Sequence, residues 1–322
     1  MPELPVETPT SVARPPTARE LFTDRAFRGL THGFAWFTIL LVVLIVGGVA
    51  WQAWPTAQRF GLEPLTSTKW DAGKEQYGIL PEIAGTVYSS VLGVAIGSLL
   101  GVAVAVFLTE DYLPPRVEVF IKNVVELLAA IPSVVYGLWG IFVVIPAIRP
   151  ACEWLHDHLG WVPIFGTRLS GPGLLPAALV LAIMVLPTVS AISRDAIAAV
   201  PPKIREAAYG LGATRWEAIR AVIIPSAARG IYGSIILAFG RALGETMALA
   251  MLVGNSSTLT WSIFSPSNTL AALIANKFPE AATPERGVLM YAALVLLAIT
   301  LLVNVLGALI LRRATYFPQG AK

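Results

Sequence analysis

The sequence predicts an all-α polytopic membrane protein that crosses the bilayer six times. Of its 322 residues, 56% are apolar and only 13% are charged, and the mean hydropathy is +0.70. These values lie outside the range of soluble domains. Several stretches of the chain also lack Asp, Glu, Lys and Arg over lengths that suit a transmembrane helix. The composition therefore excludes a soluble enzyme and a disordered chain, and a net charge of +3 is too small to suggest nucleic acid as a partner.

The predicted spans follow from the thickness of the bilayer. A hydrocarbon core of about 30 Å needs roughly 20 apolar residues in a helix. Charge-free stretches of this kind cover residues 33–54, 83–107, 127–148, 169–193 and 287–311. A further span, residues 227–254, is apolar enough to cross but carries Arg241 and Glu245 near its middle and runs into a stretch of Asn, Ser and Thr. We therefore expect six transmembrane helices.

The remaining segments lie outside the membrane in this prediction. They are a tail at residues 1–32, a loop at residues 55–82 and a tail at residues 312–322. The first span is too long, and starts too late in the chain, for a secretory signal. Residues 18–34 place an apolar side chain at every fourth position, which favours a short helix on the membrane surface, although a tail running straight into the span fits as well. The single cysteine, Cys152, leaves no intrachain disulfide and no multi-cysteine metal site, and we predict no bound metal.

Basic residues set the expected orientation, because they collect on the cytoplasmic side of a membrane protein. Most of the 23 lysines and arginines fall in the two tails and in the loops after the second and fourth spans. The opposite side holds Arg59, Lys69, Lys74, Arg149, Arg168, Lys277 and Arg286. Both termini should therefore be cytoplasmic, and residues 55–82 should form an extracytoplasmic loop.

The longest cytoplasmic connection contains a patterned segment, residues 201–226. Ile204, Ala207, Ala208 and Leu211 fall on one face of a predicted helix that Gly210 and Gly212 end. Thr214 and Glu217 have capping-box spacing for a second helix, which we expect to end at Pro225. Two short helices around a glycine turn would form a compact knob whose apolar face can dock in a groove of another protein.

Charged residues inside the membrane mark a candidate pathway. An ionised side chain at the bilayer centre costs roughly 2.5–3.5 kcal/mol on insertion scales, so such residues usually face a cavity or a partner. The candidates are Arg241 and Glu245, four residues apart on one expected helix face, and Glu126 at the start of the third apolar stretch. A guanidinium suits an oxyanion such as phosphate, sulfate or carboxylate. An ion pair of Arg241 with Glu245 that only neutralises itself, and a Glu126 at the cytoplasmic interface near Lys122, remain open.

Proline and glycine positions shape two of the spans. Pro132 interrupts the hydrogen-bond ladder of the third span, which fits either a bent helix lining a pathway or a kink used for packing. In the second span, Gly93, Gly97 and Gly101 recur at every fourth position. Such a stripe favours close packing of another helix.

The cytoplasmic knob carries a recognisable motif. The string EAAYGLGATRWEAIRAVIIP, residues 206–225, resembles the EAA loop of ABC-importer permeases, with Val222 and Ile224 as mild departures. The matching residues are Glu206, Ala207, Ala208, Gly212 and Pro225. The resemblance implies that these residues dock on an ATPase subunit. Because the chain has no G-x-x-x-x-G-K-[ST] loop, we expect ATP and Mg to bind a separate ATPase chain and this chain to be no enzyme.

Two further strings narrow the resemblance. GRALGETMALAMLVGN, residues 240–255, and ELLAAIPSVVYGLWGIFVVIP, residues 126–146, resemble signatures of the phosphate-specific ABC permeases, with Ala130 where that family usually has glycine. FGLEPLTSTKWD, residues 60–71, and the second string resemble the PstC type more than the PstA type. The similarity runs from about residue 60 to the last span, and the first sixty residues are not distinctive.

This resemblance implies a permease subunit of an ATP-driven phosphate importer in a prokaryotic inner membrane. Residues 83–311 would form a type I ABC importer permease domain of five helices, following the first span. Its expected partners are a PstA-type permease, two copies of an ABC ATPase, an extracytoplasmic phosphate-binding protein and membrane lipid. Arg241, Glu245 and Glu126 are expected to line the pathway. The alternatives are an ion-coupled secondary anion transporter, a permease for another oxyanion, and a membrane receptor that moves no solute.

Overall fold

The computed structural model describes residues 17–110 and 112–314, and the expected tails therefore lie partly outside the described residues. The chain divides into two compact units, Met1–Val49 and Ala50–Lys322. In the described part of the first unit the chain is the N-terminal portion of α1 (Ala18–Phe60), a single helix of 43 residues. At 1.5 Å per residue this helix is roughly 65 Å long, about twice the thickness of a hydrocarbon core. The expected surface helix at residues 18–34 is thus continuous with the first span rather than separate from it.

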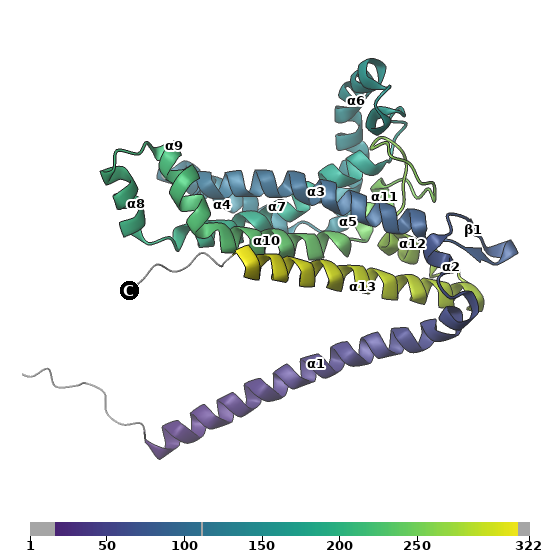
Figure 1. Cartoon of the computed structure of the whole chain (residues 1–322), viewed down its shortest axis with the longest axis horizontal. Coiled ribbons are helices and arrows are strands. Elements are labelled where there is room, and N and C mark those ends of the chain that lie inside the picture. Colours follow the sequence, from purple (N-terminus) through teal and green to yellow (C-terminus); the bar gives the residue numbers. More distant parts are fainter. Residues whose placement is uncertain (1–16, 111, 315–322) are drawn as a thin grey trace, which may run out of the picture. The chain divides into compact units, whose positions relative to one another are not determined.

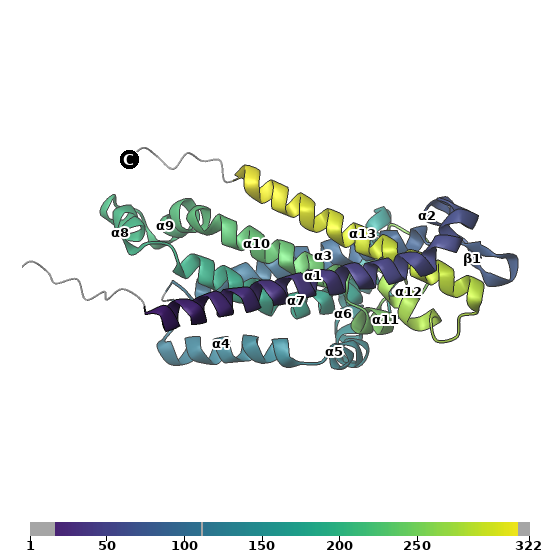
Figure 2. The same cartoon turned by 90° about the horizontal axis from the view of Figure 1, so that it is seen from below.

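Four long helices form the body of the second unit. They are α3 (Leu80–Phe107), α7 (Leu174–Ala198), α10 (Ile224–Leu243) and α13 (Thr283–Ala314). The helices run side by side in both views, with α7 packed between α3 and α10 (Figures 1 and 2). Most of the α7 side chains that face its neighbours are apolar and buried, and the buried Ser193 hydroxyl bonds to that of Ser234 in α10 at 3.0 Å, which makes α7 the central helix of the unit.

The glycine stripe of α3 is a packing face, as its spacing predicts. A methyl group on Gly97 would approach Val185 Cγ2 of α7 to 2.5 Å and the Ala182 carbonyl oxygen to 2.7 Å. Gly93 and Gly101, one turn to either side, also face α7, where a methyl group would approach Leu181 to 3.0 Å and Val189 to 2.8 Å. The absence of side chains at these positions lets the two helix backbones approach each other closely, which is a common way of associating helices in a bilayer.

The segment between α1 and α3 has more structure than a loop. It contains α2 (Glu63–Thr66), a hairpin of β1 (Trp70–Asp71) and β2 (Gln76–Tyr77), and the 3₁₀ turn η1 (Ala72–Lys74) between the strands. The strands are antiparallel, with Trp70 opposite Tyr77. Asp71 accepts hydrogen bonds from the backbone of Gly73 and Lys74, and this side-chain cap fixes the hairpin turn. The hairpin is a small β element in an otherwise helical chain.

The third apolar stretch is broken at Pro132. The amphipathic helix α4 (Pro115–Ala130) ends there, and α5 (Ser133–Trp139), the π-helical turn η2 (Gly140–Val144) and α6 (Ile145–Leu159) follow. Pro132 has extended backbone angles, φ −60° and ψ 142°, so it separates two helices instead of bending one. The Tyr136 hydroxyl donates to the Leu128 carbonyl oxygen at 2.8 Å and bridges the break. Beyond η2, α6 leaves the direction of the bundle at a steep angle (Figure 1).

The stretch at residues 227–254 is also discontinuous, in contrast to the single span expected. The helix α10 ends at Leu243, and a separate short helix, α11 (Met247–Leu252), begins after three residues. A polar loop then leads to α12 (Leu270–Lys277), and it begins with a turn in which Gly254 and Asn255 both have positive φ. The core around α11 is formed with α5 and α7. The break therefore lies inside the packed bundle.

Six helical segments of the described chain are long and apolar enough to cross a membrane, which confirms the expected number. They are Ala18–Phe60, Leu80–Phe107, Ser133–Leu159, Leu174–Ala198, Arg215–Leu243 and Thr283–Arg312. The fifth segment begins earlier than expected, at Arg215, and ends at Leu243. The predicted all-α class is confirmed as well, with the two-stranded hairpin as the only sheet in the described residues.

Candidate functional site: a membrane arginine and a helical knob

Arg241 lies in the last turn of α10 and reaches across to the middle of α7. Its Nη1 atom donates to Thr188 Oγ1 at 3.4 Å. A cavity of about 470 Å³ opens beside it, lined also by Gly240 of α10 and Asn304 of α13. The arginine is exposed on the surface of this chain although it lies at the depth of the central helices. A guanidinium in lipid would cost roughly 2.5–3.5 kcal/mol, so this surface requires water, a second protein chain or an anion.

Glu245 does not share a helix face with Arg241, contrary to the expectation from their spacing. Because α10 ends at Leu243, Glu245 lies in the connection to α11, and its Oε1 accepts a hydrogen bond from the backbone nitrogen of Ala248 at 3.3 Å. A carboxylate at this place also suits the positive end of the α11 dipole. The two residues form no ion pair within the described chain. The self-neutralising pair is therefore not what holds Arg241 in the membrane.

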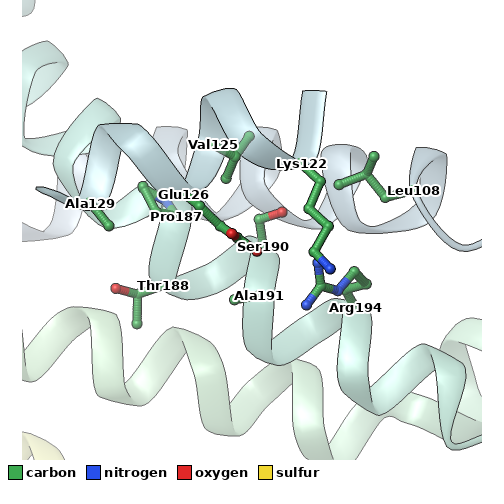
Figure 3. A pocket seen from close by; sticks show the side chains of 10 residues that line it. All are labelled: Leu108, Lys122, Val125, Glu126, Ala129, Pro187, Thr188, Ser190, Ala191 and Arg194. Atoms are coloured by element: carbon green, nitrogen blue, oxygen red, sulfur yellow. The ribbon is translucent and has the colours of Figure 1, made fainter. Parts of the chain in front are cut away.

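Glu126 lies in a second cavity, of about 240 Å³, between α4 and α7. Figure 3 shows its carboxylate directed across the cavity toward Ser190 of α7. Lys122, one turn earlier on α4, lines the same cavity, as does Thr188, the hydroxyl that Arg241 contacts. Glu126 and Arg241 thus approach opposite sides of one segment of α7. Of the three expected pathway residues, Arg241 bonds to Thr188 and Glu126 shares a cavity with it. Glu245 instead accepts a hydrogen bond from the backbone of α11.

The knob consists of α8 (Pro202–Gly210) and α9 (Arg215–Ala218) around the turn at Gly212. Gly212 has φ +84°, its nitrogen donates to the Tyr209 carbonyl oxygen, and the Ala213 nitrogen donates to that of Ala208. These bonds form a Schellman motif, in which a residue of positive φ ends the helix. The expected capping box is present, with Thr214 and Glu217 each accepting from the other's backbone nitrogen.

The second helix of the knob does not end at Pro225, which corrects the sequence expectation. From α9 the chain continues through a π-helical turn, η4 (Ile219–Ile223), into α10, and Pro225 lies in the first turn of α10. A proline at the start of a helix loses no intrahelical hydrogen bond, and the wider π turn accommodates its ring. The knob is consequently joined to the helix of Arg241 by one continuous helical segment, Arg215–Leu243.

The apolar face predicted for the knob is only partly covered. Ala208 is buried against the chain, whereas Glu206 and Ala207 are exposed and Leu211 is 90% exposed. An exposed leucine beside exposed EAA residues is a surface that a partner can cover.

An ion pair that the sequence analysis missed fixes the knob to the bundle. Arg205 of α8 contacts the buried carboxylate of Glu110 just after α3 at 2.5 Å, and its second nitrogen donates to the Ile197 carbonyl oxygen of α7 at 2.7 Å. The Glu110 side chain is 5% exposed and that of Arg205 is 20% exposed. Removal of one partner from such a buried pair leaves an uncompensated charge, which typically costs about 3–5 kcal/mol. The 95-residue separation of the two residues hides this pair from local sequence patterns.

A second missed carboxylate lies at the opposite end of α3. Glu82 is fully buried, and its Oε1 accepts a hydrogen bond from Ser257 Oγ at 2.5 Å. Thr86, one turn later, accepts from the backbone nitrogen of Leu270 at 2.9 Å. These contacts attach α3 to the polar loop between α11 and α12. Among the residues that the structure covers, no group of three or more His, Cys, Asp or Glu is arranged to hold a metal ion.

The fold agrees with that of solved ABC importers. A bacterial alginate ABC transporter, solved in complex with an alginate-bound periplasmic protein, matches with a TM-score of 0.64 at 17% identity, covering 92% of this chain and 98% of that one. The MetNI methionine ABC transporter in an inward-facing conformation matches with a TM-score of 0.55 at 17% identity, covering 74% and 96%. At such identity these likenesses show the fold alone. Together with the discontinuous helices and the knob, they define the fold of type I ABC importer permeases.

Sequence comparisons give the family. Residues 93–316 match the family described as "Binding-protein-dependent transport system inner membrane component". The phosphate transport system permease protein PstC of Haemophilus influenzae is 39% identical, covering 91% of this chain and 95% of that protein. The PstC proteins of Xylella fastidiosa and Methanocaldococcus jannaschii, the latter designated probable, are 36% and 37% identical over at least 89% of this chain. This chain belongs to the PstC family of transport system permeases.

Proposed function

We propose that this chain is the PstC-type permease subunit of an ATP-driven phosphate importer and forms part of the path that inorganic phosphate takes across the membrane. The observation that carries the proposal is the exposed Arg241 guanidinium at the depth of the central helices. Among the described residues its hydrogen-bond partner is the Thr188 hydroxyl, and a guanidinium keeps its charge and can hold an oxyanion through two hydrogen bonds. The relatives are named phosphate transport system permeases, and phosphate is therefore the oxyanion that we propose.

The role of Arg241 would be to offer the passing anion a temporary positive partner. The long 3.4 Å bond to Thr188 is weak enough to be exchanged for a bond to phosphate. A tight site in the middle of the membrane would trap the ion, so weak binding favours transport. Glu126 would face the path from α4. Glu245 would act indirectly, because its hydrogen bond to the first turn of α11 stabilises the helix break that follows Arg241.

The partners follow from the exposed surfaces and from the family. Glu206, Ala207, Ala208, Gly212 and Pro225 would place the knob on an ABC ATPase, which binds the ATP and Mg. Because Arg215–Leu243 is one helical segment, a displacement of the knob by the ATPase is transmitted toward Arg241. A PstA-type permease would cover the exposed side of Arg241, a second ATPase copy would dock on that permease, and an extracytoplasmic phosphate-binding protein would deliver the ion.

The proposed location is a prokaryotic inner membrane with both termini in the cytoplasm. The knob and the C-terminal end of α13 lie toward one end of the bundle, and the hairpin and α12 toward the other (Figures 1 and 2). The knob end carries the larger share of lysine and arginine, as expected of the cytoplasmic side. On this orientation α6 and its neighbouring loops face the extracytoplasmic space, where a binding protein would arrive.

A competition experiment tests the substrate. Cells that lack their own high-affinity phosphate uptake would express this chain together with its partner permease, ATPase and binding protein, and uptake of labelled phosphate would be measured. We expect arsenate to compete, because it shares the tetrahedral geometry and charge of phosphate, and sulfate to compete far less. Uptake of labelled sulfate at a rate equal to that of phosphate would reject the assignment of phosphate as the substrate.

A further inference from the structure

We infer that the cavity between α4 and α7 is a second oxyanion site, which binds a phosphate group on the cytoplasmic side of Arg241. Its place in the pathway rests on the proposed function, but its chemistry does not. Two cations line the cavity, Lys122 from α4 and Arg194 from α7, and Arg194 lies near the C-terminal end of α7, from which the chain continues to the knob. Neither residue was among the expected pathway residues.

The two cations are directed at the same place. In Figure 3 the ammonium group of Lys122 points toward the guanidinium of Arg194. Like charges that face each other repel, and the repulsion is stronger where protein and lipid lower the effective dielectric constant. An anion between them converts this repulsion into two attractions. A guanidinium and an ammonium supply several hydrogen-bond donors, which match the oxygens of a phosphate group.

The carboxylates nearby do not satisfy these cations. Arg194 contacts Asp195 at 3.4 Å, but the Asp195 side chain is 73% exposed, and an ion pair so open to solvent contributes little. Glu126 lies in the cavity, yet it forms no ion pair with Lys122 or Arg194 in the part of the chain that the structure describes, and it is directed at Ser190. Its negative charge would instead weaken the hold on a bound anion, as suits a site from which the ion must leave.

A shared residue connects this cavity with Arg241. Thr188 lines the α4–α7 cavity and also accepts the hydrogen bond from Arg241 on the other side. Arg194 lies six residues further along α7 toward the knob, which is about 9 Å for a helix. Along the helix axis the next cation after Arg241 is therefore about 9 Å away, on the α4 side of α7.

The phosphate group in the cavity could come from either of two sources, a phospholipid headgroup or free inorganic phosphate. Leu108, Val125 and Ala129 are apolar, so a phospholipid with its acyl chain along α4 could place its headgroup between the cations. Free inorganic phosphate in transit fits the same donors. Both sources present the same tetrahedral oxyanion, and the experiment below distinguishes them.

Protection of a thiol tests the site. Ala191 lines the cavity and is exposed, and the native Cys152 is only 2% exposed and should react slowly. The complete complex carrying Ala191→Cys would be placed in nanodiscs of phosphatidylcholine, and its reaction with a small methanethiosulfonate reagent would be timed. Ala198→Cys, on the same helix but outside the cavity, is the matched control. Phosphate would be compared with chloride at equal ionic strength.

We expect phosphate to slow the reaction at Ala191→Cys by a factor of 1 + [phosphate]/Kd, which is about threefold at twice the Kd, and to leave Ala198→Cys unchanged. The slowing should vanish in Lys122→Gln and in Arg194→Gln and persist in Lys122→Arg. If the occupant is an anionic headgroup, exchange of zwitterionic phosphatidylcholine, whose choline offsets the charge of its phosphate, for anionic phosphatidylglycerol slows the reaction instead, with the same dependence on Lys122 and Arg194.

Two results would overturn the inference. One is a reaction at Ala191→Cys that neither phosphate nor phosphatidylglycerol slows. The other is a slowing that survives in the Lys122→Gln Arg194→Gln double variant, provided that this variant still co-purifies with the ATPase. Uptake of labelled phosphate, measured on the same complex, reports on the proposed function separately.

Discussion

Arg241→Gln should abolish phosphate uptake while leaving the protein assembled. The change removes the charge and keeps a side chain of moderate length that can still bond to Thr188. In the structure the guanidinium contributes one hydrogen bond of 3.4 Å, which is near the limit for such a bond, so the loss of folding free energy should stay below about 1 kcal/mol. Insertion becomes easier because a charge leaves the membrane.

The effect on transport is much larger. A unit charge at about 4 Å from a monoanion contributes roughly 4 kcal/mol at an effective dielectric constant of 20. Because about 1.4 kcal/mol corresponds to a tenfold change, the affinity of phosphate for the site at Arg241 should fall by about a thousandfold. Arg241→Lys should keep part of the activity, since the ammonium retains the charge but loses the planar fork.

The assay is uptake of labelled phosphate, with co-purification of the ATPase as the control for assembly. Glu245→Gln added to Arg241→Gln should not restore uptake, because Glu245 caps α11 and is not paired with the arginine in this chain. Uptake within twofold of the wild-type rate in an assembled Arg241→Gln complex, or its recovery in the double variant, would refute the reasoning.

Three further predictions concern packing, docking and topology. Gly97→Val should destabilise the α3–α7 contact by about 1–3 kcal/mol and lower the Tm. The control is Gly233→Val in α10, where an added Cβ meets nothing within 4 Å and the Tm should stay the same. Equal Tm values for the two variants would contradict the packing role. Gly212→Val should reduce ATPase co-purification, because a β-branched residue is strained at φ +84°, and unchanged co-purification and uptake would show that the knob does not dock. In sealed cells an impermeant thiol reagent should label Lys69→Cys and not Lys203→Cys, and labelling of the second would overturn the orientation.

The parts of the fold that local chemistry determines could be predicted. The Gly212 turn and the Thr214–Glu217 capping box follow from residue types at fixed spacings, and the structure contains both. The packing role of Gly97 follows from the four-residue period of small residues. Six spans follow from hydropathy, because a bilayer demands a minimum length of apolar helix.

The parts that depend on tertiary contacts could not be predicted. Gly244 and Glu245 interrupt the apolar run only briefly, so hydropathy predicts one span across them. The end of α10 depends on the hydrogen bond of Glu245 to the start of α11 and on the packing of α11 against α5 and α7. Pro225 resembles a helix end, yet the π turn before it allows the helix to continue. The Glu110–Arg205 pair joins positions that only the fold brings together. Thr188 carries no charge and gave no signal beyond its position after a proline.

The most direct test of the proposed function is the energy source of transport. Proteoliposomes would contain this chain with its partner permease and ATPase, with binding protein and labelled phosphate outside and ATP and Mg inside. We predict that phosphate accumulates only when ATP and a hydrolysis-competent ATPase are present, and that a proton gradient alone drives none. Accumulation driven by a proton gradient in vesicles that lack the ATPase would contradict the account and identify a secondary transporter.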